Sequence, residues 1–292
     1  MSKNNLLLEK RNRYARLSKV IIVATSLASI STLAATITNP ADLFGGLADW
    51  KLDLPIGPST DATDIKQPQL ATFSLSPYFE LNPSKTGVNF RALAGGARTS
   101  ANTAFSRSEL RQMSGTSLAA WSCTSGTDEM TVDQTLRATT THMAEASLGQ
   151  IHDDVNDIVM IKYKGPAYPN ANGTTDTGVV NANFNNDSQE VTLDTNYTLG
   201  DEMTVDVQHS GNVNTVTYRN VTKGTSKVAS VVATGTSGPC YFKAGLYIAA
   251  CSIVDINGNT NSVCAAKPWK QTQWETDPKA FSELEIRSIV LK

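Results

Sequence analysis

Alternation of apolar and polar residues over short stretches is the feature that most constrains the fold of this chain. Met203, Val205 and Val207 alternate with polar residues, and the stretches 215–218 and 286–291 are rich in β-branched residues. Such period-two patterns predict strands with one buried face and one face in water. Turn-forming residues separate the stretches at 210–212, 223–224, 235–238 and 257–258. No long stretch has a helical period, so we predict an all-β sandwich or jelly roll.

The first 35 residues differ from the rest. Six basic residues and one acid are followed by an apolar run over 20–34 and then by Ala35. This order is typical of a secretory signal peptide over 1–35, cleaved after Ala34 or Ala35. The alternative is a single membrane anchor, but the run is shorter than the roughly 20 residues that span a bilayer. We therefore expect a secreted or periplasmic monomer, with no membrane association in the mature form and one domain over 36–292.

The charge of the chain excludes one class of partner. The net charge is −2, and removal of residues 1–35 changes it to about −7. Proteins that bind nucleic acid usually carry an excess of basic residues, so we expect no nucleic-acid partner.

Four cysteines, all after residue 35, predict two disulfides in an exported protein. Cys251 and Cys264 flank a turn-rich stretch, so we favour that local pair, which leaves Cys123 with Cys240. The other two connectivities remain open. The spacing fits no zinc pattern, and three histidines are too few to complete one, so we expect no metal site.

Two further expectations concern the remaining segments. Short helices are expected near 40–47 or after Pro278. The stretch 170–188 is the most polar and turn-prone of the chain. It is interpreted as a long loop, either a functional lid or a solvated excursion.

One candidate strand carries charges at alternate positions. Arg107, Glu109 and Arg111 would share one face of it. Glu109 can hold the two guanidiniums, which are planar groups suited to gripping a carboxylate. The alternative interpretation is a ladder of surface ion pairs.

A second candidate strand places Gln150 and His152 on one face, with Ile151 turned to the core. Glutamine offers a donor and an acceptor, and histidine accepts a proton near neutral pH. A lone histidine on a strand is more often structural, so this segment indicates a site only together with the others.

A third candidate strand presents Tyr241, Lys243, Gly245 and Tyr247 on one face. Glycine inside a strand often marks the close approach of a ligand or of another backbone. The alternative is a structural strand with aromatic cross-strand packing.

Together the three strands offer basic, amide, imidazole and phenol groups but a single acid. Glycoside hydrolysis usually needs two carboxylates, and no nucleophile-elbow motif of a serine hydrolase is present. The set suits an anionic substrate from which a proton is removed.

The segments 107–111, 150–152 and 241–247 resemble, in order, the three signature strands of alginate lyases of polysaccharide lyase family 7. The stretch 49–55 is similar to the first strand of that family, and the resemblance covers about 45–292. It implies a concanavalin A-like β-jelly roll with a concave substrate groove, and no metal or organic cofactor.

The resemblance also implies β-elimination on alginate, a 1,4-linked polyuronate. Arg107 and Gln150 would neutralise the uronate carboxylate and stabilise the charge that develops on it. His152 or Tyr247 would take the C5 proton, and Tyr247 would protonate the leaving O4. The implied substrate-binding residues are Glu109, Arg111, Lys243 and Tyr241.

Ile151 is associated in this family with guluronate preference, and we expect endo action. Two departures qualify the resemblance: Ala249 stands where the family has a glutamine, and Asp153 and Asp154 place like charge beside an anion site. The alternatives are a lyase for another polyuronate, such as glucuronan, and a non-catalytic carbohydrate-binding jelly roll.

Overall fold

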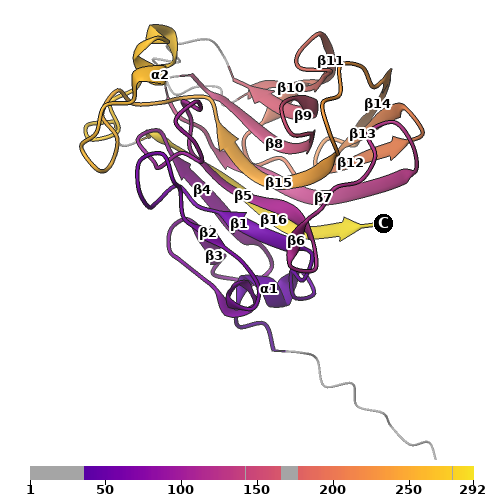
Figure 1. The fold of residues 1–292 in the computed structure, drawn as a ribbon, viewed down its shortest axis with the longest axis horizontal. Helices are drawn as coiled ribbons and strands as arrows, with labels where there is room; N and C mark the ends of the chain where they lie inside the picture. The colour runs from indigo at the N-terminus through magenta and orange to yellow at the C-terminus, as the bar shows by residue number, and fades with distance from the viewer. Residues whose placement is uncertain (1–35, 142, 166–176, 278) are drawn as a thin grey trace, which may run out of the picture. The chain divides into compact units, whose positions relative to one another are not determined.

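Two antiparallel sheets packed face to face form the fold of residues 36–292 (Figure 1). A computed structural model describes residues 36–141, 143–165, 177–277 and 279–292. Within these ranges the all-β jelly-roll sandwich predicted from the period-two patterns is confirmed. The predicted signal peptide lies outside the described residues.

The first sheet has nine strands within the described ranges. In spatial order they are β11 (Gln189–Thr198), β10 (Thr177–Phe184), β9 (Asp157–Lys164), β8 (Glu145–His152), β15 (Tyr241–Ile248), β5 (Arg107–Ser114), β1 (Trp50–Asp53) and β2 (Asp64–Ile65), with β6 (Ser117–Leu118) paired to β5.

The second sheet has seven strands in the same part of the chain. Their order is β14 (Thr225–Val232), β13 (Val213–Asn220), β12 (Met203–Ser210), β7 (Thr127–Ala138), β16 (Phe281–Leu291), β4 (Val88–Leu93) and β3 (Phe79–Leu81).

The core lies between the sheets and follows the alternation of the sequence. Met203, Val205 and Val207 of β12 are buried, as predicted. On the facing sheet, Ile151 of β8 and Phe242 of β15 are also buried in this core. Their sequence neighbours on each strand therefore point to the outer face of the nine-stranded sheet.

The helices are short. They are α1 (Pro40–Leu43), α2 (Ser262–Ala265) and the 3₁₀ turns η1 (Gln69–Thr72) and η2 (Pro268–Lys270). The helix expected near residue 40 is confirmed, whereas the one expected after Pro278 is wrong. Phe281 already begins β16, where core packing of Leu284 and Ile286 favours the extended backbone.

The polar stretch 170–188 is only partly described, and its interpretation as one long loop is wrong. Residues 177–184 form β10, in which Val180, Ala182 and Phe184 are buried in the core. Asn181 and Asn183 alternate with them, so the asparagines mark the outer face of a strand. The turn itself is confined to 185–188, and residues 185–187 have positive φ.

Both favoured disulfides are present, Cys123–Cys240 and Cys251–Cys264. The first joins the segment after β6 to the residue immediately before β15. The second closes the segment that carries α2. The disulfide prediction is therefore confirmed.

Gly245 of β15 is the position where a strand glycine is required. Its φ is +132°, and a Cβ there would lie 2.7 Å from the Ser108 carbonyl oxygen and 2.8 Å from the Glu109 Cα. The close approach expected from the sequence is thus to the backbone of β5, and it lets β15 run tightly against that strand.

Replacement of Gly245 by alanine is expected to lower the free energy of unfolding by about 2–4 kcal/mol, from backbone strain and overpacking. Gly149→Ala on the adjacent strand β8 is the matched control, because its Cβ would meet only ordinary contacts at 3.7 Å and beyond. Urea unfolding of both variants measures the difference. An equal, small loss in the two variants would contradict this account of β15.

Candidate active site

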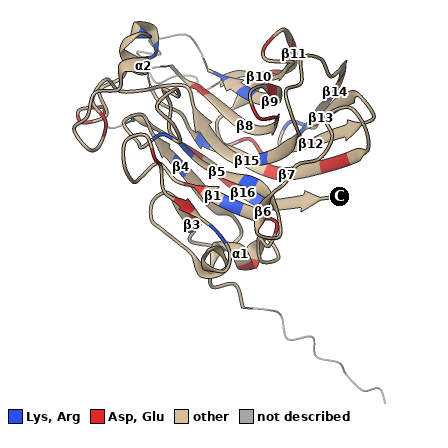
Figure 2. Ribbon diagram, in the orientation of Figure 1, with Lys and Arg blue, Asp and Glu red and all other residues tan. Residues whose placement is uncertain are grey.

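Strands β8, β15 and β5 lie side by side, and their register aligns the candidate residues in rows. Gln150, Lys243 and Arg111 are directly opposite one another across the three strands. His152 lies opposite Tyr241. Figure 2 shows basic residues, in blue, on the neighbouring strands β5 and β15. The structure therefore brings together residues that are up to about 140 positions apart in the chain.

Glu109 lies at the centre of these rows, with 1% of its surface exposed. Its Oε2 is 2.9 Å from Arg107 Nη1 and 3.6 Å from Lys243 Nζ. Gln150 Nε2 donates to Oε1 at 2.6 Å. Burial raises the pKa of Glu109, but Lys243, Arg107 and Gln150 together lower it further, so the net shift is downward. Glu109 is therefore an ionised anchor for three side chains.

The cations of this cluster outnumber its anion. Burial, opposed by Glu109, lowers the pKa of Lys243 to about 8. For Arg107 burial also lowers the pKa, but Glu109 and its neighbours raise it more, so the guanidinium stays charged. Among the described residues, the buried atoms Arg107 Nε and Arg111 Nη1 have no hydrogen-bond partner. Buried unpartnered donors are costly, so a further anion is the group that this cluster is built to accept.

Arg111 departs from the sequence-based expectation. Glu109 was expected to hold both arginines, but its two oxygens are occupied by Arg107, Lys243 and Gln150. Arg111 instead stacks on Tyr241, with its Cζ 3.8 Å from the ring centroid. The aromatic ring, rather than the carboxylate, orients this guanidinium.

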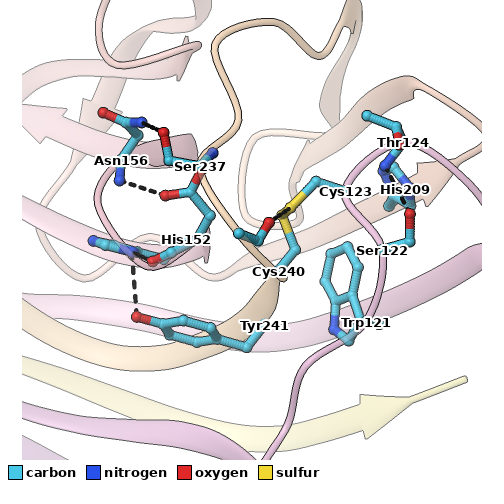
Figure 3. Close-up of a disulfide and its surroundings, with 12 residues drawn as sticks. Trp121, Ser122, Cys123, Thr124, His152, Asn156, His209, Ser237, Cys240 and Tyr241 are labelled. Carbon is cyan, nitrogen blue, oxygen red and sulfur yellow. Dashed lines mark hydrogen bonds between the residues drawn. A yellow bond between two sulfur atoms is a disulfide. The ribbon is translucent and has the colours of Figure 1, made fainter.

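His152 has a partner at each ring nitrogen. Figure 3 shows the contact of its ring with Tyr241. Its Nδ1 contacts the Asp153 carbonyl oxygen and lies 3.2 Å from the Tyr241 hydroxyl. Its Nε2 lies 3.3 Å from Asp157 Oδ1. Burial, and then the charge of Lys243, lower the pKa of His152 to about 4. The imidazole is therefore neutral near pH 7 and able to accept a proton.

Tyr247 is the second group suited to proton transfer. Its hydroxyl is 3.2 Å from Thr103 Oγ1, and Arg107 Cζ lies 4.2 Å from its ring centroid. Burial raises the pKa of Tyr247, although Arg107 and Thr103 oppose the shift. The phenol is thus protonated and can donate.

Two hollows continue this surface across β1 and β2. One of about 300 Å³ is lined by Arg107, Arg111 and Lys243, and one of about 480 Å³ by Arg111 and Tyr241. Lys51 lines both. Acidic residues line them as well, but Lys51 is paired with Asp53 at 2.6 Å and with Asp64 at 3.4 Å. The outer face of the sheet therefore offers a polar groove next to the cluster.

Of the two acids that follow His152, Asp154 is exposed and lines the hollow of about 480 Å³, whereas Asp153 does not disturb the surface as the sequence suggested. Asp153 is fully buried, and its carboxylate accepts the backbone N–H groups of Val155, Asn156 and Ser237. It therefore closes the turn between β8 and β9 and points away from the groove.

Sequence reasoning missed two residues, Asp157 and Thr103. Asp157 is on β9, which β8 and β15 separate from the strand of Glu109, and only the register of the β8–β9 hairpin places Asp157 next to His152. Alternation along 157–164 would place Asp157 on the core face with Val159 and Ile161, and only the irregularity of register between Ile151 and His152 brings it opposite His152. Thr103 lies in a loop, where no period applies. Among the described residues, no three His, Cys, Asp or Glu side chains are grouped as a metal site would require.

The family model described as alginate lyase matches residues 44–274. The chain belongs to the alginate lyase family. The resemblance noted in the signature strands is thereby confirmed.

Relatives of this family share both sequence and fold. The chain is 37% identical to an alginate lyase of Klebsiella pneumoniae over 99 residues, which span 31% of that protein and 33% of this chain. Alginate lyase AlgAT5 of polysaccharide lyase family 7 is 31% identical, with a TM-score of 0.64 over 88% of this chain and 99% of that one. The alginate lyase of Corynebacterium sp. is 27% identical, with a TM-score of 0.68 over 87% and 97%.

Replacement of Glu109 by glutamine in this alginate lyase family member leaves two buried cations without their carboxylate. We expect a loss of about 3 kcal/mol in the free energy of unfolding at neutral pH. The pKa of Glu109 is lower in the folded chain than in the unfolded chain, where it is near 4.5. Ionised Glu109 therefore stabilises the fold at a pH above the unfolded pKa, and this stabilisation is lost as the pH falls through the folded pKa. The difference between wild type and Glu109→Gln should therefore shrink on acidification below that value.

Glu190→Gln is the control for this prediction. Glu190 pairs with Lys164 near the surface, where an ion pair contributes at most about 1 kcal/mol. Denaturant unfolding across the pH range gives both values. Similar losses in the two variants would show that Glu109 is not the anchor of the cluster.

Proposed function

We propose that this chain is a polysaccharide lyase that cleaves alginate by β-elimination. One observation supports it above the others. The Glu109-centred cluster presents unpartnered guanidinium N–H groups beside a neutral imidazole and a protonated phenol, all on one face. Anion binding, proton acceptance and proton donation are the three operations that elimination from a uronate requires.

The uronate carboxylate would occupy the cationic cluster. The C5 proton is weakly acidic while the adjacent carboxylate keeps its full charge. Arg107 and Gln150 donate hydrogen bonds to that carboxylate, and these bonds strengthen as charge moves onto it in the transition state. Arg111 and Lys243 hold neighbouring uronates through their charge, and Tyr241 keeps Arg111 in place.

Proton transfer would then involve His152 and Tyr247. His152 accepts the C5 proton, and the C5–H electron pair forms the C4–C5 double bond. The bond from C4 to O4 breaks, and the Tyr247 hydroxyl donates its proton to O4. Thr103, at 3.2 Å, orients that hydroxyl.

A base and an acid on different side chains suit guluronate, in which the proton and the leaving group lie on opposite sides of the ring. We therefore propose a guluronate preference, and the identity of Ile151 agrees with the family pattern, although its side chain lies in the core. Endo action is supported by the hollows that continue past Arg111 to Lys51, where further uronates of a polymer can bind.

Export is the setting that we propose for this activity. Both disulfides form in oxidising compartments, outside the cell or in the periplasm. The substrate groove is built from one chain, which supports action as a monomer.

Two alternatives remain testable. A lyase for glucuronan would use the same cluster, and Ala249 in place of the family glutamine favours a changed preference. A non-catalytic binding protein would need the cations but neither the neutral imidazole nor the phenol, so His152 and Tyr247 argue against it.

The direct test is a substrate panel. Purified protein is incubated with polyguluronate, polymannuronate and glucuronan, and the ultraviolet absorbance of the unsaturated product is followed. We expect the fastest increase on polyguluronate. No increase on any of the three would exclude a lyase, and activity on glucuronan alone would exclude alginate as the substrate.

Tyr247→Phe removes only the hydroxyl that donates to O4. We expect kcat to fall by about 10²–10⁴-fold, because a positioned acid contributes that much, while polymer binding is retained. Tyr78→Phe is the control and should keep wild-type turnover. Near-normal kcat in Tyr247→Phe would remove Tyr247 from the proton-transfer role.

A further inference from the structure

The turn between β8 and β9 places the carboxyl group of Asp157 beside His152, the candidate base. His152 and Asp157 are directly opposite each other in the β8–β9 register, after an irregularity next to Ile151. Asp157 Oδ1 lies 3.3 Å from His152 Nε2. Asp153, buried in the turn, fixes this geometry through its bonds to the turn backbone.

Hydrogen-bond chemistry determines which ring nitrogen carries the proton. A carbonyl oxygen only accepts, so the Nδ1 that contacts the Asp153 carbonyl must carry a hydrogen. In the neutral imidazole the lone pair is then on Nε2, which faces Asp157. Two unprotonated acceptors at 3.3 Å repel each other, so one proton between them is favoured.

We propose that Asp157 is a positioning residue that shares one proton with His152, and so sets the pH above which His152 can accept the C5 proton. While the shared proton is present, the Nε2 lone pair is engaged and cannot act as a base. Once it leaves to solvent, the lone pair is free, and the adjacent carboxylate stabilises the imidazolium that forms when the C5 proton arrives. This inference rests on the proposed function, because it concerns the base of that reaction.

The charges around the pair agree with a shared proton. Burial and Lys243 lower the pKa of His152, whereas burial raises the pKa of Asp157, with Asp187 and Glu109 adding to that rise and Lys243 and Lys162 opposing it. The groups that face the pair are Lys243, Tyr241 and Tyr247 on β15, Arg107 and Glu109 on β5, Lys162 on β9 and Asp187 in the turn after β10.

Two substitutions of Asp157 separate this role from a structural one. Asp157→Ala leaves His152 to titrate alone, so the acid limb of the kcat profile should move to lower pH by about one unit or more. Asp157→Asn keeps a side chain at the same place, but its amide can donate permanently to Nε2. That variant should lose kcat across the whole pH range. Glu202→Gln removes an exposed acid immediately before β12 that lines neither hollow, and it should leave the acid limb where the wild type has it.

Nitrogen NMR of the histidine side chains gives a readout that does not need activity. The full chain has three histidines, so substitution of His152 assigns its signals. We expect Nδ1 to carry a hydrogen at every pH. The Nε2 signal should titrate with the acid limb of the wild type, and its midpoint should fall in Asp157→Ala.

The outcomes distinguish this inference from the proposed function. If the wild type is active but Asp157→Ala changes neither the Nε2 titration midpoint nor the acid limb of the kcat profile, the shared proton is overturned. The proposed lyase function is then unaffected. If the wild type is inactive on every polyuronate but the Nε2 midpoint still falls in Asp157→Ala, the shared proton is supported and the proposed function is overturned. An imidazolium that persists throughout the active pH range would overturn the inference.

Discussion

The buried carboxylate of Glu109 is the interaction on which the site depends. Removing a carboxylate from water is costly unless its oxygens are fully occupied. Here Arg107 comes from the same strand, and Lys243 and Gln150 come from the next two strands. A slip of one residue in either register would turn these partners into the core and leave the charge unpaired. The energetic demand of Glu109 therefore specifies strand pairing and site geometry together.

The same cluster explains how an acidic protein can bind a polyanion. Without residues 1–35 the net charge is about −7, which gives no long-range attraction for such a substrate. Binding must then depend on local cations whose donors are desolvated and incompletely satisfied, as at Arg107 and Arg111. Asp53 also acts on Arg107 and Lys243 and, opposing the effect of burial, raises the pKa of both, but its carboxylate is itself paired with Lys51 at 2.6 Å. The disulfide of Cys240 holds the start of β15, next to Tyr241 (Figure 3).

Much of this arrangement could be predicted from sequence, because side-chain facing on a strand depends only on alternation. The shared faces of Arg107 with Glu109, and of Gln150 with His152, followed from that period. Contacts between strands did not, because register and turn geometry decide them. Asp157 reaches His152 only through the β8–β9 turn, and Arg111 turns to an aromatic ring that another strand supplies.

The central claim is that this cluster drives elimination without adding water to the cleaved bond. Mass spectrometry of oligouronates produced from polyguluronate in water labelled with heavy oxygen tests it most directly. Elimination gives products with an unsaturated non-reducing end and no incorporated label, which is the predicted result. Saturated products that carry the label from solvent at the cleavage site would show hydrolysis and contradict the account.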